Sequence, residues 1–189
     1  MPTLVAYRAP GELEVVTRPT PSPARSDAVL KVLACGVCGS DVTSYYEGKY
    51  VSPGQVMGHE FVGVVTARGE ECPLAVGDRV MVRPMRSCGG CWYCLRGDIH
   101  LCARTGELSL SYGLPGGYAE EVLVPDCRPG ENVHLLAEGV DPNDALWAEP
   151  LAVAVHAVDR AGPLDGARVA VLGAGSIGLC LLSAARAAG

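Results

Sequence analysis

The sequence predicts a mainly β domain, a barrel or a sandwich, with a small cysteine-rich lobe, followed by the first strand–helix unit of an α/β domain. Short apolar runs recur between turns rich in glycine and proline over residues 3–125, as in domains built from many short strands. Four cysteines fall within residues 88–102, at a spacing typical of metal sites. Three glycines within residues 173–178 lie between an apolar run and an alanine-rich run, the context of a strand, a tight turn and a helix.

The composition favours a folded protein with little affinity for polyanions. The chain has 189 residues and 49% hydrophobic content, enough for one sizeable core or for one domain and part of another. Its formal net charge is −6, so nucleic acid is not an expected partner. The 24 glycines and 14 prolines, against a single phenylalanine, indicate many turns between short strands.

The elements of the β domain follow from the alternation of apolar and polar residues and from the turns between them. Residues 3–8 and 12–17 alternate around Ala-Pro-Gly-Glu and predict a hairpin. Residues 39–48 favour a short helix that ends at a glycine. Further strands are predicted at 28–37, 59–69, 76–84 and 116–125.

Beyond residue 141, helical patterns replace the short strands. Asp141 is a candidate N-cap, Pro142 occupies a first-turn position, and the helical run is expected to be interrupted at Pro150. The predicted organisation is a β domain over 1–150 with the cysteine lobe at 86–104, then a linking helix at 150–162 and the start of an α/β domain over 151–189.

No segment predicts a membrane span or a secretory leader. The N-terminus lacks a basic stretch followed by an apolar one, which favours a cytoplasmic protein with no membrane partner. Residues 169–185 are uncharged, but they are short for a span, lie between Arg168 and Arg186, and contain three glycines. In a reducing cytosol, nine cysteines are more often metal ligands and free thiols than disulfides.

The cysteine lobe has the spacing C-x2-C-x2-C-x7-C, from Cys88, Cys91, Cys94 and Cys102. Four thiolates around one ion suit structural zinc, because they leave no coordination position for substrate or water. An iron–sulfur cluster commonly has its fourth cysteine after three residues and before proline, whereas here it follows seven and precedes Ala103. A nucleic-acid-binding zinc ribbon would need more basic neighbours, and buried cysteines without a metal remain the simplest alternative.

A second set of donors predicts an open metal site. Cys38, His59 and Glu60 offer a thiolate, an imidazole and a carboxylate, a combination typical of catalytic zinc. Glu149 adds an acid at the edge of an apolar run. Taken singly, these residues are equally well explained as a buried thiol, a hydrogen-bonded histidine and a solvated helix end.

The glycine fingerprint predicts a dinucleotide site. Its glycines allow a tight turn and a close approach of the pyrophosphate, and the following helix directs its N-terminus at the negative charge. The candidate cofactor-binding residues are Gly173, Gly175, Ser176, Ile177 and Gly178.

The motifs Cys-Gly-Ser-Asp, Gly-His-Glu, the cysteine lobe, Glu-Pro-Leu and Gly-Ala-Gly-Ser-Ile-Gly occur in one order along residues 1–189. In this order the sequence resembles the zinc-containing medium-chain dehydrogenases, most closely the polyol branch that includes sorbitol, butanediol and threonine dehydrogenases. The resemblance implies a GroES-like catalytic barrel with two zinc ions, followed by a Rossmann domain that binds NAD or NADP. It also implies an alcohol or polyol substrate and a homo-oligomer, a dimer or a tetramer.

The resemblance assigns the open metal site residue by residue. Cys38 and His59 correspond to ligands of the catalytic zinc, and Glu60 corresponds to a ligand or an exchangeable one. Glu149 lies where alcohol dehydrogenases place a third ligand, usually cysteine. In polyol-type members this residue is glutamate, which binds the zinc or holds its water.

The resemblance also assigns a route for the substrate proton. Ser40 corresponds to the hydroxyl that takes the proton, and Asp41 to the carboxylate that orients the histidine ligand. Thr43 stands where many relatives have histidine, the next member of the relay. A threonine hydroxyl passes a proton but does not store one near neutral pH, so the path beyond Ser40 is open.

Two functions are consistent with the sequence. Only the first strand and helix of the nucleotide-binding half are expected within the 189 residues, so we expect an N-terminal fragment of a dehydrogenase that is inactive alone. The alternative is a non-catalytic zinc-binding GroES-like module. The acidic residue that would distinguish NAD from NADP is expected about 20 residues beyond the glycines, outside this sequence.

Overall fold

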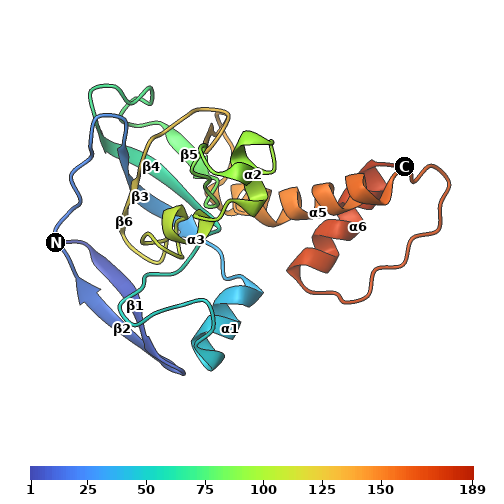
Figure 1. The fold of residues 1–189 in the computed structure, drawn as a ribbon, viewed down its shortest axis with the longest axis horizontal. Helices are drawn as coiled ribbons and strands as arrows, with labels where there is room; N and C mark the ends of the chain where they lie inside the picture. Colours follow the sequence, from blue (N-terminus) through green and yellow to red (C-terminus); the bar gives the residue numbers. More distant parts are fainter. The chain divides into compact units, whose positions relative to one another are not determined.

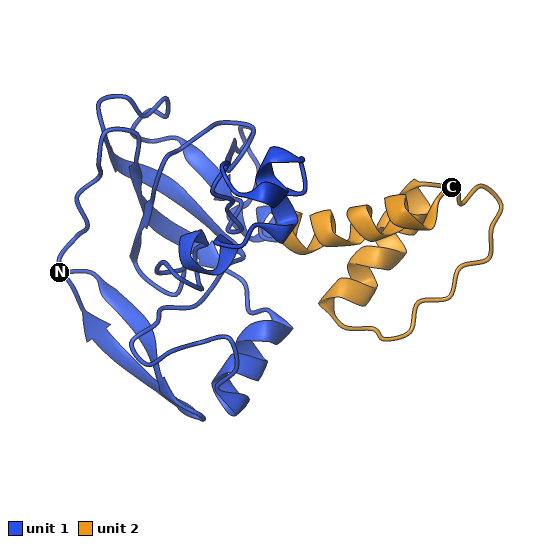
Figure 2. Ribbon diagram, in the orientation of Figure 1, with its two compact units in different colours: residues 1–146 blue, residues 147–189 orange.

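The computed structural model describes residues 1–189, which form two compact units, 1–146 and 147–189 (Figure 2). The first unit contains all of the β-structure and the cysteine lobe, and the second contains two helices and the segment between them. No helix in the chain combines the length and the apolar composition that crossing a bilayer requires.

A five-stranded antiparallel sheet forms the centre of the first unit, and this confirms the predicted sheet-rich domain (Figure 1). Its strand order is β6-β3-β4-β5-β7. Strands β3, β4, β5 and β6 each lie within a predicted segment, whereas β7, with three residues, is too short to show a pattern. The bounds are β3 Ala28–Cys35, β4 Phe61–Arg68, β5 Arg79–Val82, β6 Glu121–Val124 and β7 Val133–Leu135.

A hairpin of β1 (Thr3–Ala9) and β2 (Glu12–Thr17) forms a separate two-stranded sheet, as predicted. Gly11 has a φ of +78° at the turn, a conformation that glycine adopts without strain. Backbone hydrogen bonds join β1 to the rest of the unit, from Val5 N–H to Tyr118 O at 2.8 Å and from Tyr7 N–H to Gln55 O at 2.8 Å.

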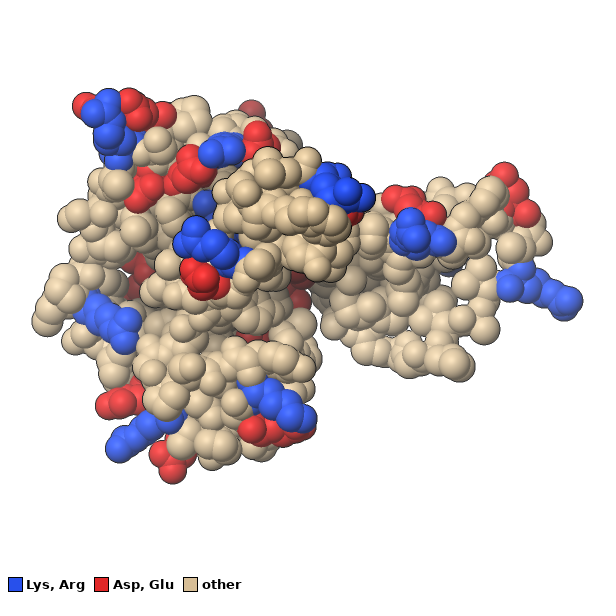
Figure 3. Space-filling model, viewed as in Figure 1, with Lys and Arg blue, Asp and Glu red and all other residues tan.

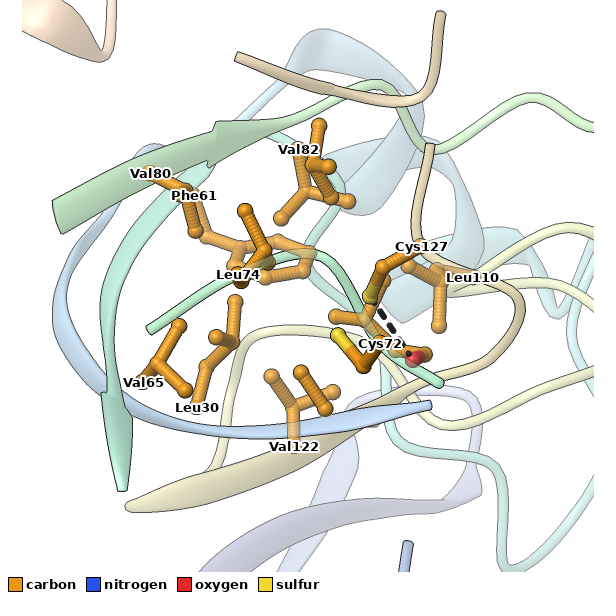
Figure 4. Packing of buried hydrophobic residues seen from close by; sticks show 13 residues of the cluster. Leu30, Phe61, Val65, Cys72, Leu74, Val80, Val82, Leu110, Val122 and Cys127 are labelled. Atoms are coloured by element: carbon orange, nitrogen blue, oxygen red, sulfur yellow. Dashed lines mark hydrogen bonds between the residues drawn. The ribbon is translucent and has the colours of Figure 1, made fainter. Parts of the chain in front are cut away.

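The core of the first unit lies on one side of the five-stranded sheet. Alternate positions on neighbouring strands point to the same face, so their apolar side chains pack together (Figure 4). Cys72 and Leu74, from the segment between β4 and β5, complete this cluster. The strand residues of the cluster that Figure 4 labels are Leu30, Phe61, Val65, Val80, Val82 and Val122.

The strand predicted at 116–125 is shorter than expected, because its first half pairs elsewhere. Strand β6 begins only at Glu121. Before it, Gly116, Gly117 and Tyr118 donate backbone hydrogen bonds to Val56, Gly58 and Met57, respectively. The sequence pattern does not show this change of partner, which places residues 116–118 beside the segment that precedes His59.

The helices of the first unit are short. Helix α1 covers Gly39–Glu47 and ends at Gly48, whose φ is +66°. Asp141 caps α4 by accepting a hydrogen bond from the Asn143 N–H at 2.7 Å, as its position before Pro142 predicted. The remaining short helices are α2 Trp92–Leu95, η1 Ile99–Leu101, α3 Thr105–Leu108 and α4 Pro142–Ala145.

The second unit consists of α5 (Ala148–Ala161) and α6 (Ser176–Ala187), which pack through Ala154, Val158 and Cys180. Two expectations for this unit were wrong. Pro150 does not interrupt the helix, because it lies in the first turn of α5, where a missing N–H costs no intrahelical bond.

The strand expected before the glycine fingerprint is also absent. Residues 167–175 have no assigned strand, and their apolar side chains are largely exposed. A strand requires a neighbouring strand to satisfy its backbone groups, and no strand of the second unit offers one.

Candidate metal centre

Cys38 stands at the N-terminus of α1, and the local sequence explains why. Its backbone N–H donates to Asp41 Oδ2 at 2.9 Å, so the third residue of the helix closes the first turn. An acidic residue in a first turn also interacts favourably with the helix dipole. The Cys-Gly-Ser-Asp sequence therefore forms a defined helix start that carries the Cys38 thiol.

His59 and Glu60 come directly before β4, and two glycines allow them to approach Cys38. Gly58 has a φ of +90°, and an added Cβ there would collide with Cys35 Sγ and with the Tyr118 ring. A Cβ at Gly36 would collide with the Glu60 carboxylate. The two ligand-bearing segments are therefore in contact only because neither has a side chain at these positions.

The structure brings Cys38, His59 and Glu60 into one group. Their ligand atoms, one from each residue, all lie within 4.8 Å of one another. His59 and Glu60 are buried and Cys38 is half-buried. One sulfur, one nitrogen and one carboxylate oxygen fit the donor set of a zinc site with a position left open.

Asp41 lies behind His59. Its Oδ1 is 3.7 Å from His59 Nδ1, and both side chains are buried. The distance is too long for a hydrogen bond, and His59 Nδ1 is a buried polar atom without a hydrogen-bond partner. A carboxylate beside one ring nitrogen is the usual arrangement when the other nitrogen binds a metal, so Nε2 of His59 is the nitrogen that fits a zinc ion.

Tyr118 belongs to this site although the sequence analysis did not identify it. Its hydroxyl oxygen lies 2.9 Å from Asp41 Oδ2 and 3.1 Å from Gly36 O. Burial raises the pKa of Tyr118, and the negative charge of Asp41 raises it further, so the phenol keeps its proton. A lone tyrosine in an apparent strand, 77 residues from Asp41, gives no sequence signal of this contact.

Cys35 is three residues from Cys38 but is not part of the donor group. Burial, followed by the negative charges of Asp41 and Glu60, raises the pKa of Cys35 to about 12. The Cys35 thiol donates to Gly36 O at 3.6 Å, and its sulfur is not among the grouped ligand atoms. The Cys-x-x-Cys spacing therefore does not make this pair a joint site.

The other predicted residues of the open site have different surroundings. Ser40 is half-buried in the first turn of α1. The Thr43 hydroxyl donates to Gly39 O at 3.2 Å, a bond within the helix. Glu149 lies in the second unit, in the first turn of α5, and its part in metal binding stays a prediction.

The four cysteines of the lobe form a second donor group. The ligand atoms of Cys88, Cys91, Cys94 and Cys102 all lie within 4.8 Å of one another. The Sγ–Sγ distance is 3.5 Å between Cys91 and Cys94 and 3.9 Å between Cys88 and Cys94. Sulfurs at the corners of a tetrahedron, each about 2.3 Å from zinc, lie about 3.8 Å apart. The group therefore fits a zinc ion, and the distances are too long for disulfides.

Backbone N–H groups donate hydrogen bonds to sulfurs of this group, and such bonds favour the negatively charged thiolate. Cys88 N–H donates to Cys102 Sγ at 3.3 Å, and Arg104 N–H donates to the same atom at 3.4 Å. The N–H of Cys88 is the main cause that lowers the pKa of Cys102, and the N–H of Cys94 is the main cause that lowers the pKa of Cys91 to about 6. Burial, then the hydrogen bond with Cys91, raises the pKa of Cys94 to about 11. A divalent cation bound by the cluster would favour four thiolates.

The glycine fingerprint forms a turn and a helix start. Gly173 has a φ of +104°, and an added Cβ at Gly178 would collide with Gly173 O. Gly175 is the N-cap of α6, which begins at Ser176, and Ile177 is exposed in its first turn. The loop thus exposes helix N-terminal N–H groups, the feature that binds phosphate in dinucleotide sites.

On the face drawn in Figure 3, charged side chains of one sign do not form a continuous patch. Lysine and arginine side chains mostly lie next to aspartate or glutamate there. Arg25 and Glu70 form an ion pair at 3.2 Å, and Arg128 and Asp126 form one at 2.8 Å. This surface gives no electrostatic footprint for a polyanion.

Comparison with known proteins gives a family for this arrangement. Residues 24–134 match the family model described as the alcohol dehydrogenase GroES-like domain. This segment contains both donor groups, the open one and the four-cysteine one.

Individual relatives cover nearly all of the chain. A sorbitol dehydrogenase of Halalkalibacterium halodurans is 37% identical over 95% of this chain and 51% of its own length. The structure of a zinc-binding dehydrogenase from Sinorhizobium meliloti bound to NADP superposes with a TM-score of 0.91 at 34% identity, covering 100% of this chain and 54% of that one. An alcohol dehydrogenase of Escherichia coli CFT073 complexed with NADH gives a TM-score of 0.85 at 34% identity, covering 96% and 52%. The chain therefore spans about half the length of the relatives it matches.

Proposed function

We propose, from the premise that this chain belongs to the alcohol dehydrogenase GroES-like domain family, that it is the zinc-binding part of an oxidoreductase. The reaction is hydride transfer between the carbon of an alcohol or polyol and NAD or NADP. The observation that carries this proposal is the group of Cys38, His59 and Glu60, whose ligand atoms lie within 4.8 Å of one another, with Asp41 beside His59.

The residues of the open site have separate tasks in this proposal. Cys38, His59 and Glu60 hold zinc, which supplies Lewis acidity to the alcohol oxygen. Asp41 fixes the ring orientation and the tautomer of His59. Ser40, in the first turn of α1 two residues after Cys38, takes the substrate proton in this proposal. The Thr43 hydroxyl already donates to Gly39 O, so we propose that the proton leaves Ser40 to water.

Glu149 is proposed as a further zinc ligand or as the residue that holds the zinc's water. Glu149 lies in the first turn of α5, and its carboxylate is a group that binds zinc.

The four-cysteine lobe is proposed to hold a structural zinc. Cys88, Cys91, Cys94 and Cys102 provide four sulfurs at tetrahedral spacing, so no position remains for a substrate. The chain would then bind two zinc ions with different roles.

The loop from Gly173 to Gly178 is proposed to bind the pyrophosphate of the dinucleotide. Two observations support this role. Gly178 has no Cβ, which would otherwise collide with Gly173 O, and the first backbone N–H groups of α6 have no partner within the helix. Structural neighbours bound to NADP and to NADH leave both cofactors as candidates.

Cytoplasmic location and a homo-oligomer complete the proposal. All nine cysteines are free thiols, and thiolate metal sites persist in a reducing compartment. Trp92 and Leu95 on the lobe are 64% and 76% exposed, and large exposed apolar side chains often mark contacts between subunits.

Metal analysis of the 189-residue chain tests the two-zinc assignment. We expect two zinc ions per chain by mass spectrometry of the metal content, and one in Cys38→Ser. Cys72→Ala is the matched control, because Cys72 is a buried cysteine of the core outside both donor groups. Two zinc ions retained in Cys38→Ser would refute the open site.

Nucleotide titration and a hydride-transfer assay then separate the two functions. Binding of NADH or NADPH with turnover of a polyol supports the oxidoreductase directly. Two zinc ions with neither nucleotide binding nor turnover would mean that these 189 residues, taken alone, act only as a zinc-binding module.

A further inference from the structure

We propose that Tyr118 is a positioning residue of the open metal site: its hydroxyl holds the Asp41 carboxylate in the orientation that directs His59 toward the metal. This inference rests on the proposed metal-binding role of Cys38, His59 and Glu60. It adds a residue that lies outside every metal motif of the sequence.

The first step of the argument is how the two oxygens of Asp41 are used. Oδ2 accepts both the Cys38 N–H and the Tyr118 hydroxyl, each at 2.9 Å. Oδ1 is the oxygen that lies 3.7 Å from His59 Nδ1. Two donors on one oxygen fix the rotation of the carboxylate, and this leaves the other oxygen for the imidazole.

The second step is that Tyr118 is itself held on both sides. Its N–H donates to Met57 O at 3.0 Å, and its carbonyl accepts the Val5 N–H at 2.8 Å. Its ring packs over Gly58, where even a methyl group would collide with it. The tyrosine thus contacts the residue before His59, while its hydroxyl reaches Gly36 and Asp41 on the segment that carries Cys38.

The third step is burial. Asp41 is 5% exposed, so water does not readily replace a lost donor. A buried carboxylate that loses one of two donors gains rotational freedom. The Cys38 N–H alone does not determine which oxygen faces His59, so removal of the phenol oxygen loosens the imidazole without removing a metal ligand.

The experiment compares Tyr118→Phe with Tyr45→Phe. Tyr45 is on α1, and its hydroxyl donates to Gly11 O at 2.7 Å without contacting Asp41, so the control removes a hydrogen bond of the same type. The affinity of the open site for its zinc, called here the second zinc equivalent, is measured by competition with a chelator. The first equivalent is the zinc of the four-cysteine lobe. The visible spectrum of Co²⁺ in place of that zinc reports the ligand geometry.

We expect Tyr118→Phe to weaken the second zinc equivalent about tenfold, the lower end of the range for outer partners of metal ligands. The first equivalent stays unchanged, and the Co²⁺ bands shift. Tyr45→Phe leaves both equivalents and the bands as in the parent chain. In an Asp41→Asn background, Tyr118→Phe has little further effect, because the tyrosine acts through that carboxylate.

Three results would overturn the inference. These are an unchanged second equivalent in Tyr118→Phe, equal weakening of both equivalents, or an undiminished effect in the Asp41→Asn background. If the parent chain binds only one zinc, the proposed function fails first. If it binds two and Tyr118→Phe matches it, only the role of Tyr118 fails.

Discussion

At the scale of single residues, the open site depends on two places where a side chain is missing. Gly36 and Gly58 allow the segments that carry Cys38 and His59 to come within contact of each other. Sequence reasoning identified the three donors from their chemistry. It did not identify these glycines or Tyr118, because their importance lies in contacts between segments far apart in the chain.

Gly36→Ala is expected to displace the Glu60 carboxylate, because the new methyl group would collide with it. The φ of Gly36 is in a range that alanine adopts, so we expect weaker binding of the second zinc with little loss of stability. Zinc titration with a chelator checks this.

The control for this substitution is Gly39→Ala, since no atom lies within 4 Å of a Cβ built there and alanine favours the first turn of α1. Zinc affinity reduced equally in both variants would show that the Gly36–Glu60 contact is not the cause.

At the scale of elements, the cysteine lobe lacks an apolar core of its own. Helices α2 and η1 have no buried residues, and Cys102 is the one cysteine of the four that is buried. A segment with so little buried apolar surface depends on another source of folding free energy, and the proposed structural zinc would provide it. The cysteine spacing indicated that these four side chains come together, because ligands within 15 residues of sequence need few distant contacts to meet.

Removal of the lobe's metal is expected to open the lobe locally. In Cys88→Ser, trypsin should cut after Arg96, which is exposed in the lobe, at least tenfold faster than in the parent chain. The core strands should keep their circular dichroism signal, because the core cluster contains none of the four cysteines of the lobe.

Cys38→Ser is the comparison for the lobe experiment, since it alters the other donor group. Resistance of Arg96 to trypsin in Cys88→Ser, or equal cleavage in both variants, would contradict the division of roles between the two groups.

At the scale of the whole molecule, the two units differ in the size of their cores. The first unit buries thirteen residues in its main cluster, whereas the second buries Ala154, Val158, Cys180 and Ala184. Small cores give low local stability, because too little apolar area offsets the entropy of ordering the chain.

Hydrogen exchange is expected to reflect this difference. Amides of α5 and α6 should exchange at least a hundredfold faster than those of β3 and β4, since local opening follows the amount of buried apolar surface. Mass spectrometry of peptides from the exchanged 189-residue chain measures both. Equal protection of the two units would show that α5 and α6 are stabilised by more than their own core.

The sequence by itself determined the family, the sheet-rich domain and the chemistry of the donors. These depend on residue type and on short spacings, which local patterns preserve. Only the tertiary structure determined that Oδ1 of Asp41 faces His59 and that residues 116–118 pair with residues 56–58. It also determined that residues 167–175 form no strand. Each of these depends on whether the fold brings a hydrogen-bond partner from elsewhere in the chain within reach. A local sequence pattern does not show which distant groups become partners.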